Sequence, residues 1–195
     1  MFDFRSLISE VLSYCGKDSE RVSNLILEKY PDFSKLAQTD FAILSEQIGE
    51  KYATMIRVIA AIAARRITDN FKFGKEHTEK ELFDFLSGYY FDTVNETVIV
   101  LPLDSRGRVI SAEIVVEGTV NFSGVLPRKL LEIMIKHKSK SAYLAHNHPG
   151  GKAVASEEDI ETTRIVSELL RSADKELVCH YIVASGEITK LTAGD

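Results

Sequence analysis

Residues 145–159 read AHNHPGGKAVASEED and stand between an apolar run, SAYLA, and a segment with helical periodicity. The apolar run predicts a short buried strand, and the proline and glycines that follow predict a sharp turn. Because side chains two apart on a strand face the same way, His146 and His148 can present two imidazoles to one point. Ser156 and Asp159 then fit the N-cap and N3 positions of the next helix. This strand–turn–helix unit decides the fold that we expect around it.

The surrounding segments predict an α/β domain over residues 75–195. NETVIVLPLDSRGRVISAEIVVEG has β-branched runs on both sides of DSRG, which is typical of a hairpin. LPRKLLEIMIKHK has helical spacing, and ELVCHYIVAS and EITKL have the composition of strands. The helix that begins near Ser156 is expected to bury one apolar stripe, formed by Ile160, Val166, Leu169, Leu170 and Ala173. Strands that alternate with helices predict a mixed sheet with helices packed on it.

The first 70 residues predict a small all-α domain. Several segments have helical periodicity, SKLAQTDFAILSEQIG suggests two short helices, and EKYATMIRVIAAIAARRI is the longest candidate helix. Residues 68–77, TDNFKFGKEH, have no clear period and are expected to form a linker. Thr78 is then expected to cap a helix that runs into Gly88.

The composition limits where the protein is expected in the cell and what it is expected to bind. With 195 residues and a formal net charge of −5, broad nonspecific binding to nucleic acid or to an anionic membrane is disfavoured. Cys15 and Cys179 follow no pairing pattern, so reduced thiols are expected. MFDFRSLISEVLSY is a poor signal peptide, and no run approaches the roughly 20 apolar residues that cross a bilayer. We therefore expect a cytoplasmic protein without a membrane partner.

The polar groups of residues 145–159 also suggest a metal site. A His-x-His pair alone is common by chance, and Ser156 and Asp159 alone are better explained as a helix cap. Neither explanation accounts for both features at once. Two neutral imidazoles, from His146 and His148, and the carboxylate of Asp159 make a three-ligand zinc site whose fourth position is open to water. Such a site can supply hydroxide near neutral pH.

His146-x-His148-Pro149, followed after six residues by Ser156-x-x-Asp159, resembles the JAMM motif of JAB/MPN metalloproteases. The sequences LAHNHPGG and SEEDIETTRIV are most similar to the RadC-like branch of this family. The resemblance covers residues 75–195 and implies a JAB/MPN fold, a cytidine-deaminase-like mixed sheet flanked by helices. It also implies Zn²⁺ held by His146, His148 and Asp159.

The resemblance implies two catalytic residues besides the metal ligands. The family has a glutamate early on the first strand of the domain, and Glu96 stands in that place as the general acid/base. Glu113 and Glu117, on the next strand, are rivals for this role. By analogy with the family, the Ser156 hydroxyl would stabilise the oxyanion of the tetrahedral intermediate.

The chain departs from the RadC-like pattern at three places. Gly150 and Ala155 replace a serine and a proline, which predicts altered loop mobility without loss of metal. The family has Asp-His at the start of a late strand, where this chain has Cys179-His180. His180 is either a structural histidine in a buried strand or a partner of a metal ligand, and the missing aspartate weakens the second interpretation. His77 and His137 are expected to have no functional role.

In RadC-like proteins the N-terminal helices resemble a helix-hairpin-helix DNA-binding unit. Here the hairpin would be EQIGEKYATMIRVIAAIAARR, which keeps Gly49 but has Gln47 in place of another glycine. Arg57, Arg65 and Arg66 could contact a DNA backbone or could form a solvated face.

Together, these features predict a zinc-dependent metalloprotease or isopeptidase that hydrolyses an amide bond in a peptide or protein. The alternatives are a DNA-repair accessory protein of the RadC type and a non-catalytic scaffold. The weak hairpin disfavours the first alternative, and the intact set of motif ligands disfavours the second.

Overall fold

A computed structural model describes residues 3–31, 33–91, 93–118 and 122–192. The chain divides into two compact units, Met1–Ala63 and Ala64–Asp195, and each is described by itself. Within the described residues, no helix combines the length and the apolar character needed to cross a membrane.

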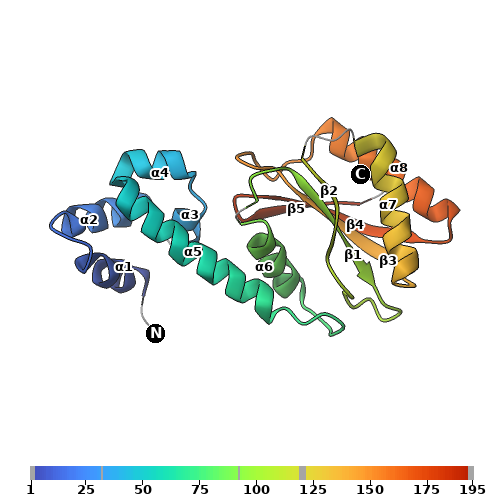
Figure 1. Cartoon of the computed structure of the whole chain (residues 1–195), viewed down its shortest axis with the longest axis horizontal. Coiled ribbons are helices and arrows are strands. Elements are labelled where there is room, and N and C mark those ends of the chain that lie inside the picture. The colour runs from blue at the N-terminus through green and yellow to red at the C-terminus, as the bar shows by residue number, and fades with distance from the viewer. Residues whose placement is uncertain (1–2, 32, 92, 119–121, 193–195) are drawn as a thin grey trace. The chain divides into compact units, whose positions relative to one another are not determined.

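The first unit consists of helices (Figure 1). These are α1 (Phe4–Ser13), α2 (Ser19–Lys29), α3 (Phe33–Ala37), α4 (Phe41–Ile48) and α5 (Glu50–Asn70), whose end lies in the second unit. The two short helices and the long one agree with the expectations from the sequence. Between α4 and α5, Gly49 has a φ of 86°, a left-handed conformation that glycine adopts without steric cost. The core of the unit is formed by Leu12, Ile26, Leu36, Leu44 and Ile56.

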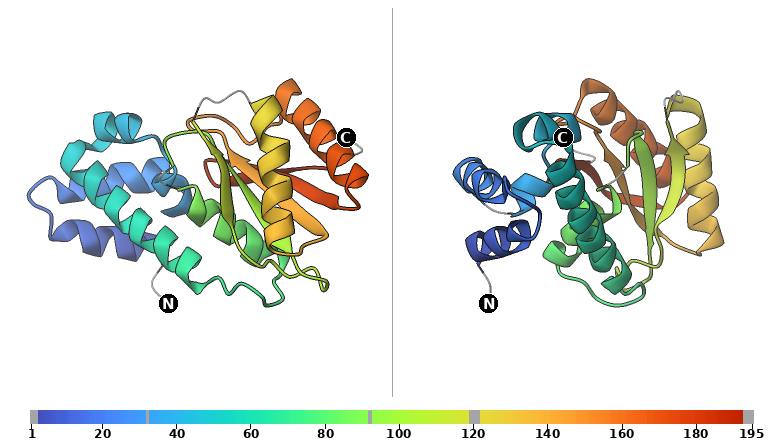
Figure 2. Two further views of the ribbon diagram at one scale, coloured as in Figure 1. Left: turned by 45° about the vertical axis from the view of Figure 1, so that its right-hand side comes forward. Right: turned by 60° about the vertical axis from the view of Figure 1, so that its left-hand side comes forward.

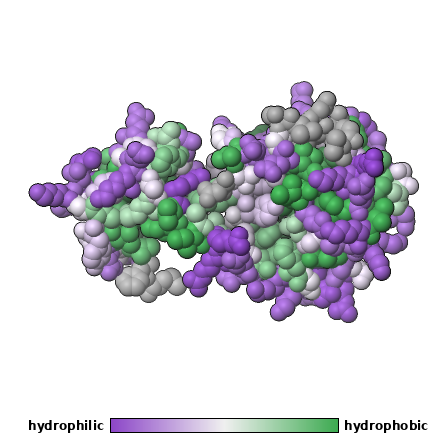
Figure 3. Space-filling model, viewed as in Figure 1, coloured by the Kyte–Doolittle hydropathy of each residue, from purple (hydrophilic) through white to green (hydrophobic). Residues whose placement is uncertain are grey.

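Some apolar side chains of α5 lie outside this core. Val58 and Ile62 are 52% and 65% exposed, and Figure 3 shows hydrophobic residues over the middle of the helix. The opposite face, which includes Ala53 and Ile56, is buried. The helix therefore buries only part of its apolar surface within its own unit.

The second unit is built on a five-stranded sheet with the order β2-β1-β3-β4-β5. The strands are β1 (Thr97–Leu103), β2 (Glu113–Glu117), β3 (Ser141–Asn147), β4 (Glu176–Ala184) and β5 (Glu187–Leu191). Strands β3 and β4 are parallel, and the other neighbouring pairs are antiparallel. A parallel pair needs a long crossover connection, and helix α8 supplies it. The sheet is mixed, as the sequence predicts.

Helices cover both faces of the sheet (Figure 2). Helices α7 (Phe122–Lys136) and α8 (Glu157–Ser172) pack on one face, where Val98 and Leu144 lie in a cluster with Leu130 and Val166. Helix α6 (Glu79–Tyr89) packs on the other face, against alternate residues of the same strands such as Ile99. Because successive side chains of a strand point to opposite faces, the apolar run of β1 is buried on both sides.

Local signals in the sequence agree with the elements of this unit. Thr78 caps α6 in a reciprocal capping box with Glu81. In the DSRG turn, the Asp104 carboxylate accepts hydrogen bonds from the backbone N–H groups of Arg106 and Arg108. The hairpin and the helix start therefore lie where the turn and cap residues predict them.

The apolar stripe expected on α8 is wrong in part. Val166 and Leu170 are buried, but Ile160 and Leu169 are 42% and 36% exposed. Ala173, at the helix end, is exposed as well. The buried face of α8 begins instead with polar residues, and it consists of Asp159, Thr163, Val166, Ser167 and Leu170. The apolar pattern could not predict this face, because the residue that is buried in the first turn, Asp159, is polar.

Candidate metal centre

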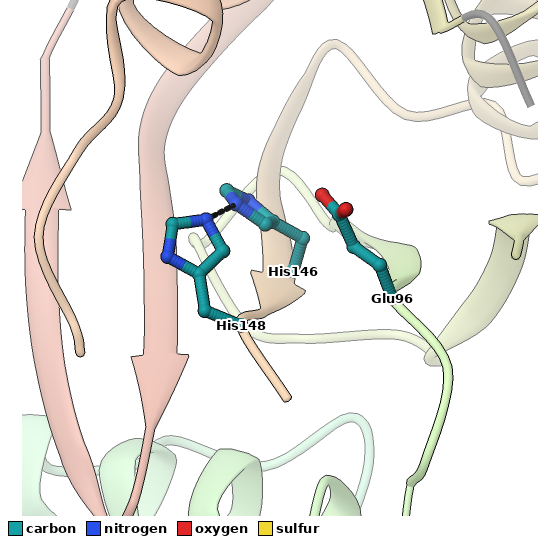
Figure 4. A group of neighbouring side chains, drawn as sticks. All are labelled: Glu96, His146 and His148. Atoms are coloured by element: carbon teal, nitrogen blue, oxygen red, sulfur yellow. Dashed lines mark hydrogen bonds between the residues drawn. The ribbon is translucent and has the colours of Figure 1, made fainter. Parts of the chain in front are cut away.

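The end of β3 brings two imidazoles together. His146 lies on β3 opposite Val98, and His148 follows the strand, where its backbone N–H donates to the carbonyl of Val183 at 2.9 Å. The two Nε2 atoms are 2.8 Å apart (Figure 4). The His-x-His spacing thus places both rings at one point, as the strand period predicts.

The first turn of α8 adds a carboxylate to this point. Oδ1 of Asp159 lies 3.0 Å from Nε2 of His146, and Oδ2 lies 3.4 Å from Nε2 of His148. Oδ2 also accepts hydrogen bonds from the backbone N–H and the hydroxyl of Ser156, both at 2.7 Å. The helix cap and the contact with the histidines therefore exist together: Oδ1 faces His146, and Oδ2 both accepts the cap hydrogen bonds and faces His148.

The surroundings of Asp159 favour its ionised form. Burial alone would raise the pKa of this carboxyl group, but the neighbouring His146 imidazole and the two hydrogen bonds from Ser156 outweigh it. The pKa is held well below its usual range. An ionised, buried carboxylate is therefore available beside two imidazole nitrogens, which is a suitable donor for a cation.

Glu96 approaches the same point from the segment immediately before β1. Its carboxylate and the ring nitrogens of His146 and His148 offer ligand atoms that all lie within 4.8 Å of one another (Figure 4). Of its two rivals, Glu113 contacts Lys136 at 2.9 Å and His137, and the other, at the end of β2, is exposed. Of the three glutamates considered from the sequence, Glu96 is the one that lines the cavity at the histidines.

A cavity of about 130 Å³ opens above these groups. Its apolar wall includes Val98, Leu126 and Leu144, and its polar wall includes Glu96, His146, His148, Ser156, Glu158, Asp159, Thr162 and His180. A water molecule takes up roughly 30 Å³ in the liquid, so the space suits an ion with a few small ligands. Two imidazoles and a carboxylate, with a cavity in front of them, fit a zinc ion that keeps an open position.

His180 lies behind His146, away from the cavity mouth. Its Nε2 is 2.8 Å from Nδ1 of His146, and its Nδ1 is 2.7 Å from the Thr163 hydroxyl. Burial lowers the pKa of His180 to about 3, so the ring is neutral. Of the two interpretations left open by the sequence, the geometry matches a partner of His146. Thr163 was not recognised from the sequence.

Cys179 faces away from this site. It packs in the cluster under α6, on the opposite face of the sheet from His180. A side chain at position 179 therefore does not lie between His180 and His146. The change from the aspartate of the family pattern leaves the contact between the two histidines in place.

Asn147 ties the strand that carries the histidines to the segment that carries Glu96. Its side-chain oxygen accepts from the backbone N–H of Thr97 at 2.8 Å, and its amide donates to the carbonyl of Asn95 at 3.1 Å. The side chain is buried, and its contacts lie on both sides of Glu96 in the sequence. This role was missed from the sequence, although an amide in a buried strand was a signal for it.

The family model for the RadC-like JAB domain matches residues 77–193, which include every residue of this centre. The chain belongs to the RadC-like JAB domain family. Similar chains include a UPF0758 protein of Photobacterium profundum, 28% identical over 180 residues, 91% of this chain and 80% of the relative. A UPF0758 protein of Vibrio parahaemolyticus is 30% identical over 164 residues, 80% of this chain and 72% of the relative. The similarity of the RadC-like chain to these relatives thus extends into the N-terminal helices.

The other two histidines of this RadC-like chain lie elsewhere. His77 stacks on Phe71, with ring centroids 3.9 Å apart, and His137 contacts Glu113 and Ser111. Both lie outside the cavity that His146 lines.

The N-terminal hairpin of the RadC-like chain uses its polar groups internally. Gln47 accepts a hydrogen bond from the Tyr30 hydroxyl at 2.8 Å, and Arg65 forms an ion pair with Asp69 at 3.0 Å. Arg57 donates to the carbonyl of Ala37 at 3.5 Å. These contacts give no specific support to DNA as a ligand.

Proposed function

We propose that this protein is a zinc-dependent hydrolase that cleaves an amide bond in a peptide or protein. One observation carries the proposal: two imidazole nitrogens 2.8 Å apart meet the Asp159 carboxylate at the base of a cavity that Glu96 lines. In the proposed organisation, residues 75–195 form the catalytic domain and residues 1–70 form a separate helical domain.

His146, His148 and Asp159 would hold the zinc. Nδ1 of His148 donates to the carbonyl of Lys152 at 3.1 Å, because a carbonyl can only accept, so its Nε2 presents a lone pair to the centre. Two nitrogen donors and one carboxylate with an open fourth position are typical of catalytic zinc. When bound, zinc lowers the pKa of water to about 7 and polarises the carbonyl of a substrate.

Glu96 would act as the general acid/base. Its carboxylate is within 4.8 Å of the ligand nitrogens and lines the same cavity, so it can reach a water molecule held there. It would accept a proton from the attacking water and then donate that proton to the nitrogen of the leaving amine.

Ser156 would donate its hydroxyl to the oxyanion. In this structure that hydroxyl donates to Asp159, so it would have to turn toward the cavity during the reaction. The backbone N–H of Ser156 would continue to hold the same carboxylate oxygen. The helix cap thus allows the hydroxyl to move without releasing Asp159.

The experiment that tests this function compares Glu96→Gln with Glu117→Gln. Glu117 is an exposed glutamate on β2 and makes a matched control. The purified proteins would be loaded with zinc, and cleavage of a mixed peptide library would be followed by mass spectrometry. We expect Glu96→Gln to keep one zinc per chain and to lose about 100-fold or more in rate, since general acid/base catalysis contributes about 10²–10⁴-fold. Glu117→Gln should behave as wild type.

Two results would contradict the proposal. Full cleavage by Glu96→Gln would move the proton transfer to another group. Wild-type protein that takes up no zinc, or the same metal content in wild type and His148→Ala, would reject the metal site.

A further inference from the structure

A chain of buried hydrogen bonds runs behind His146 and leads back to Asp159. We propose that Thr163 and His180 are positioning residues: they hold His146 in the tautomer whose Nε2 lone pair points at the metal. This inference rests on the proposed zinc site and assigns a role to two residues that do not contact the metal.

The donor and the acceptor of each hydrogen bond can be assigned by starting at Thr163. Its hydroxyl lies 2.6 Å from the backbone carbonyl of Asp159 and 2.7 Å from Nδ1 of His180. A carbonyl can only accept, so the single hydroxyl proton is donated to Asp159. The Thr163 oxygen must then accept from its other neighbour, which places a proton on Nδ1 of His180.

The same assignment of donors and acceptors extends from His180 to His146. His180 is fully buried, and a neutral imidazole with a proton on Nδ1 has a lone pair on Nε2. That atom is 2.8 Å from Nδ1 of His146, so the proton of this bond belongs to His146. The remaining nitrogen of His146, Nε2, therefore presents its lone pair to Asp159 and His148.

The hydrogen bonds run from the backbone carbonyl of Asp159 through Thr163 and His180 to Nδ1 of His146. The other ring nitrogen of His146, Nε2, faces Oδ1 of the same Asp159 at 3.0 Å, so two electron-pair donors face each other where a cation would bind. The members of this network are all buried, and in the low dielectric of the interior such bonds are strong and their breakage is costly. His146 is thus oriented by this network, whereas the Asp159 carboxylate is held by Ser156 and His148 by a loop carbonyl.

Ser167 offers a matched comparison on the same helix. It lies one turn beyond Thr163 on the buried face of α8, and its hydroxyl has no hydrogen-bond partner within the described part of the chain. Removal of this hydroxyl changes the packing of α8 without touching the network. Thr163→Val removes the hydroxyl that directs the network while keeping the shape of the side chain.

The test measures metal binding by Thr163→Val, Thr163→Ser and Ser167→Ala. Zinc affinity would be determined by competition with a chromophoric chelator, and Co²⁺ substituted for zinc would report the ligand geometry through its visible absorption. We expect Thr163→Val to lose about 10–100-fold in affinity, the range found when partners of metal ligands are removed, and to change the Co²⁺ spectrum. Thr163→Ser, which restores the hydroxyl, and Ser167→Ala should both match wild type. Equal affinity and spectra for Thr163→Val and wild type would overturn the proposal.

The ¹⁵N chemical shifts of the histidine rings separate this inference from the proposed function. We expect Nδ1 of His146 to carry a proton hydrogen-bonded to Nε2 of His180, in both zinc-loaded and metal-free protein at pH 8. An unprotonated Nδ1 on His146 would overturn the proposal whether or not zinc binds. If wild type binds neither Zn²⁺ nor Co²⁺ but carries this proton, the zinc site is rejected, whereas the directed hydrogen bond from His146 to His180 is supported.

Discussion

The two sides of the metal centre are built differently. The buried side consists of His146, Asp159, Thr163 and His180, which are all at most 9% exposed. The exposed side consists of Glu96, His148 and Ser156, and the side chain of His148 is 22% exposed. Side chains hold one another on the buried side, whereas on the exposed side the carbonyl of a loop residue, Lys152, holds His148.

In the proposed hydrolase, this difference would separate binding of the metal from access of the substrate. A network of buried side chains resists displacement because each broken bond leaves a polar group without water. The loop that follows His148 is exposed from Pro149 to Lys152 and can shift at lower cost. We infer that the buried side fixes the position of the ion, while the exposed side can adjust to a peptide.

The largest difference between the sides should appear when each histidine is removed. His146→Ala and His148→Ala should both abolish zinc binding. In metal-free protein, His146→Ala should lower the free energy of unfolding by about 3 kcal/mol, since it creates a cavity and leaves Nε2 of His180 without its donor. His148→Ala should cost less than about 1 kcal/mol. Urea unfolding in EDTA would measure both values, and an equal cost would remove the distinction between the sides.

A smaller effect is expected at Asn147, which joins the two sides. Asn147→Ala should lower the free energy of unfolding by about 2 kcal/mol, because the buried N–H of Thr97 loses its acceptor. The rate of cleavage should fall by up to about 100-fold as Glu96 shifts, with one zinc still bound. Asn95→Ala is the control, since only the backbone carbonyl of Asn95 takes part. Normal cleavage by Asn147→Ala would show that Glu96 is positioned by other contacts.

The smallest effect on stability is expected at Ser156. Ser156→Ala loses the side-chain half of the helix cap, which should cost about 1 kcal/mol and lower the melting temperature by about 2–4 °C. Ser156→Thr should restore the cap. Zinc should still bind, because the backbone N–H of residue 156 continues to hold Asp159. Loss of zinc in Ser156→Ala would mean that this hydroxyl, like the side chains of the buried side, is needed to hold the metal.

Those parts of the site that are local in sequence could be predicted. The strand period brings His146 and His148 together, and the cap pattern places Asp159 in the first turn of α8. Glu96 followed from the resemblance to a family, because no local pattern connects it with residues some fifty positions away. The mixed sheet and its helices followed from apolar periodicity.

The network behind His146 could not be predicted, because it depends on the alignment of distant strands. His180 reaches His146 through the register of β3 against β4, in which Leu144 pairs with His180. Thr163 lies on a buried helix face that the apolar pattern assigned to Ile160 instead. A polar residue that is buried because it forms a hydrogen bond with another polar residue is not marked by an apolar pattern in the sequence.

In the proposed zinc site, metal uptake would depend on the parallel register of β3 and β4 and would report when these strands have paired. A slip by one residue would bring Cys179 or Tyr181 to the place of His180, and their side chains belong to the other face of the sheet. These strands are joined through a long crossover, and such non-local pairing is slow to form. During refolding, a Co²⁺ absorption band should therefore develop only after the central pair has aligned, later than the signal from the helices.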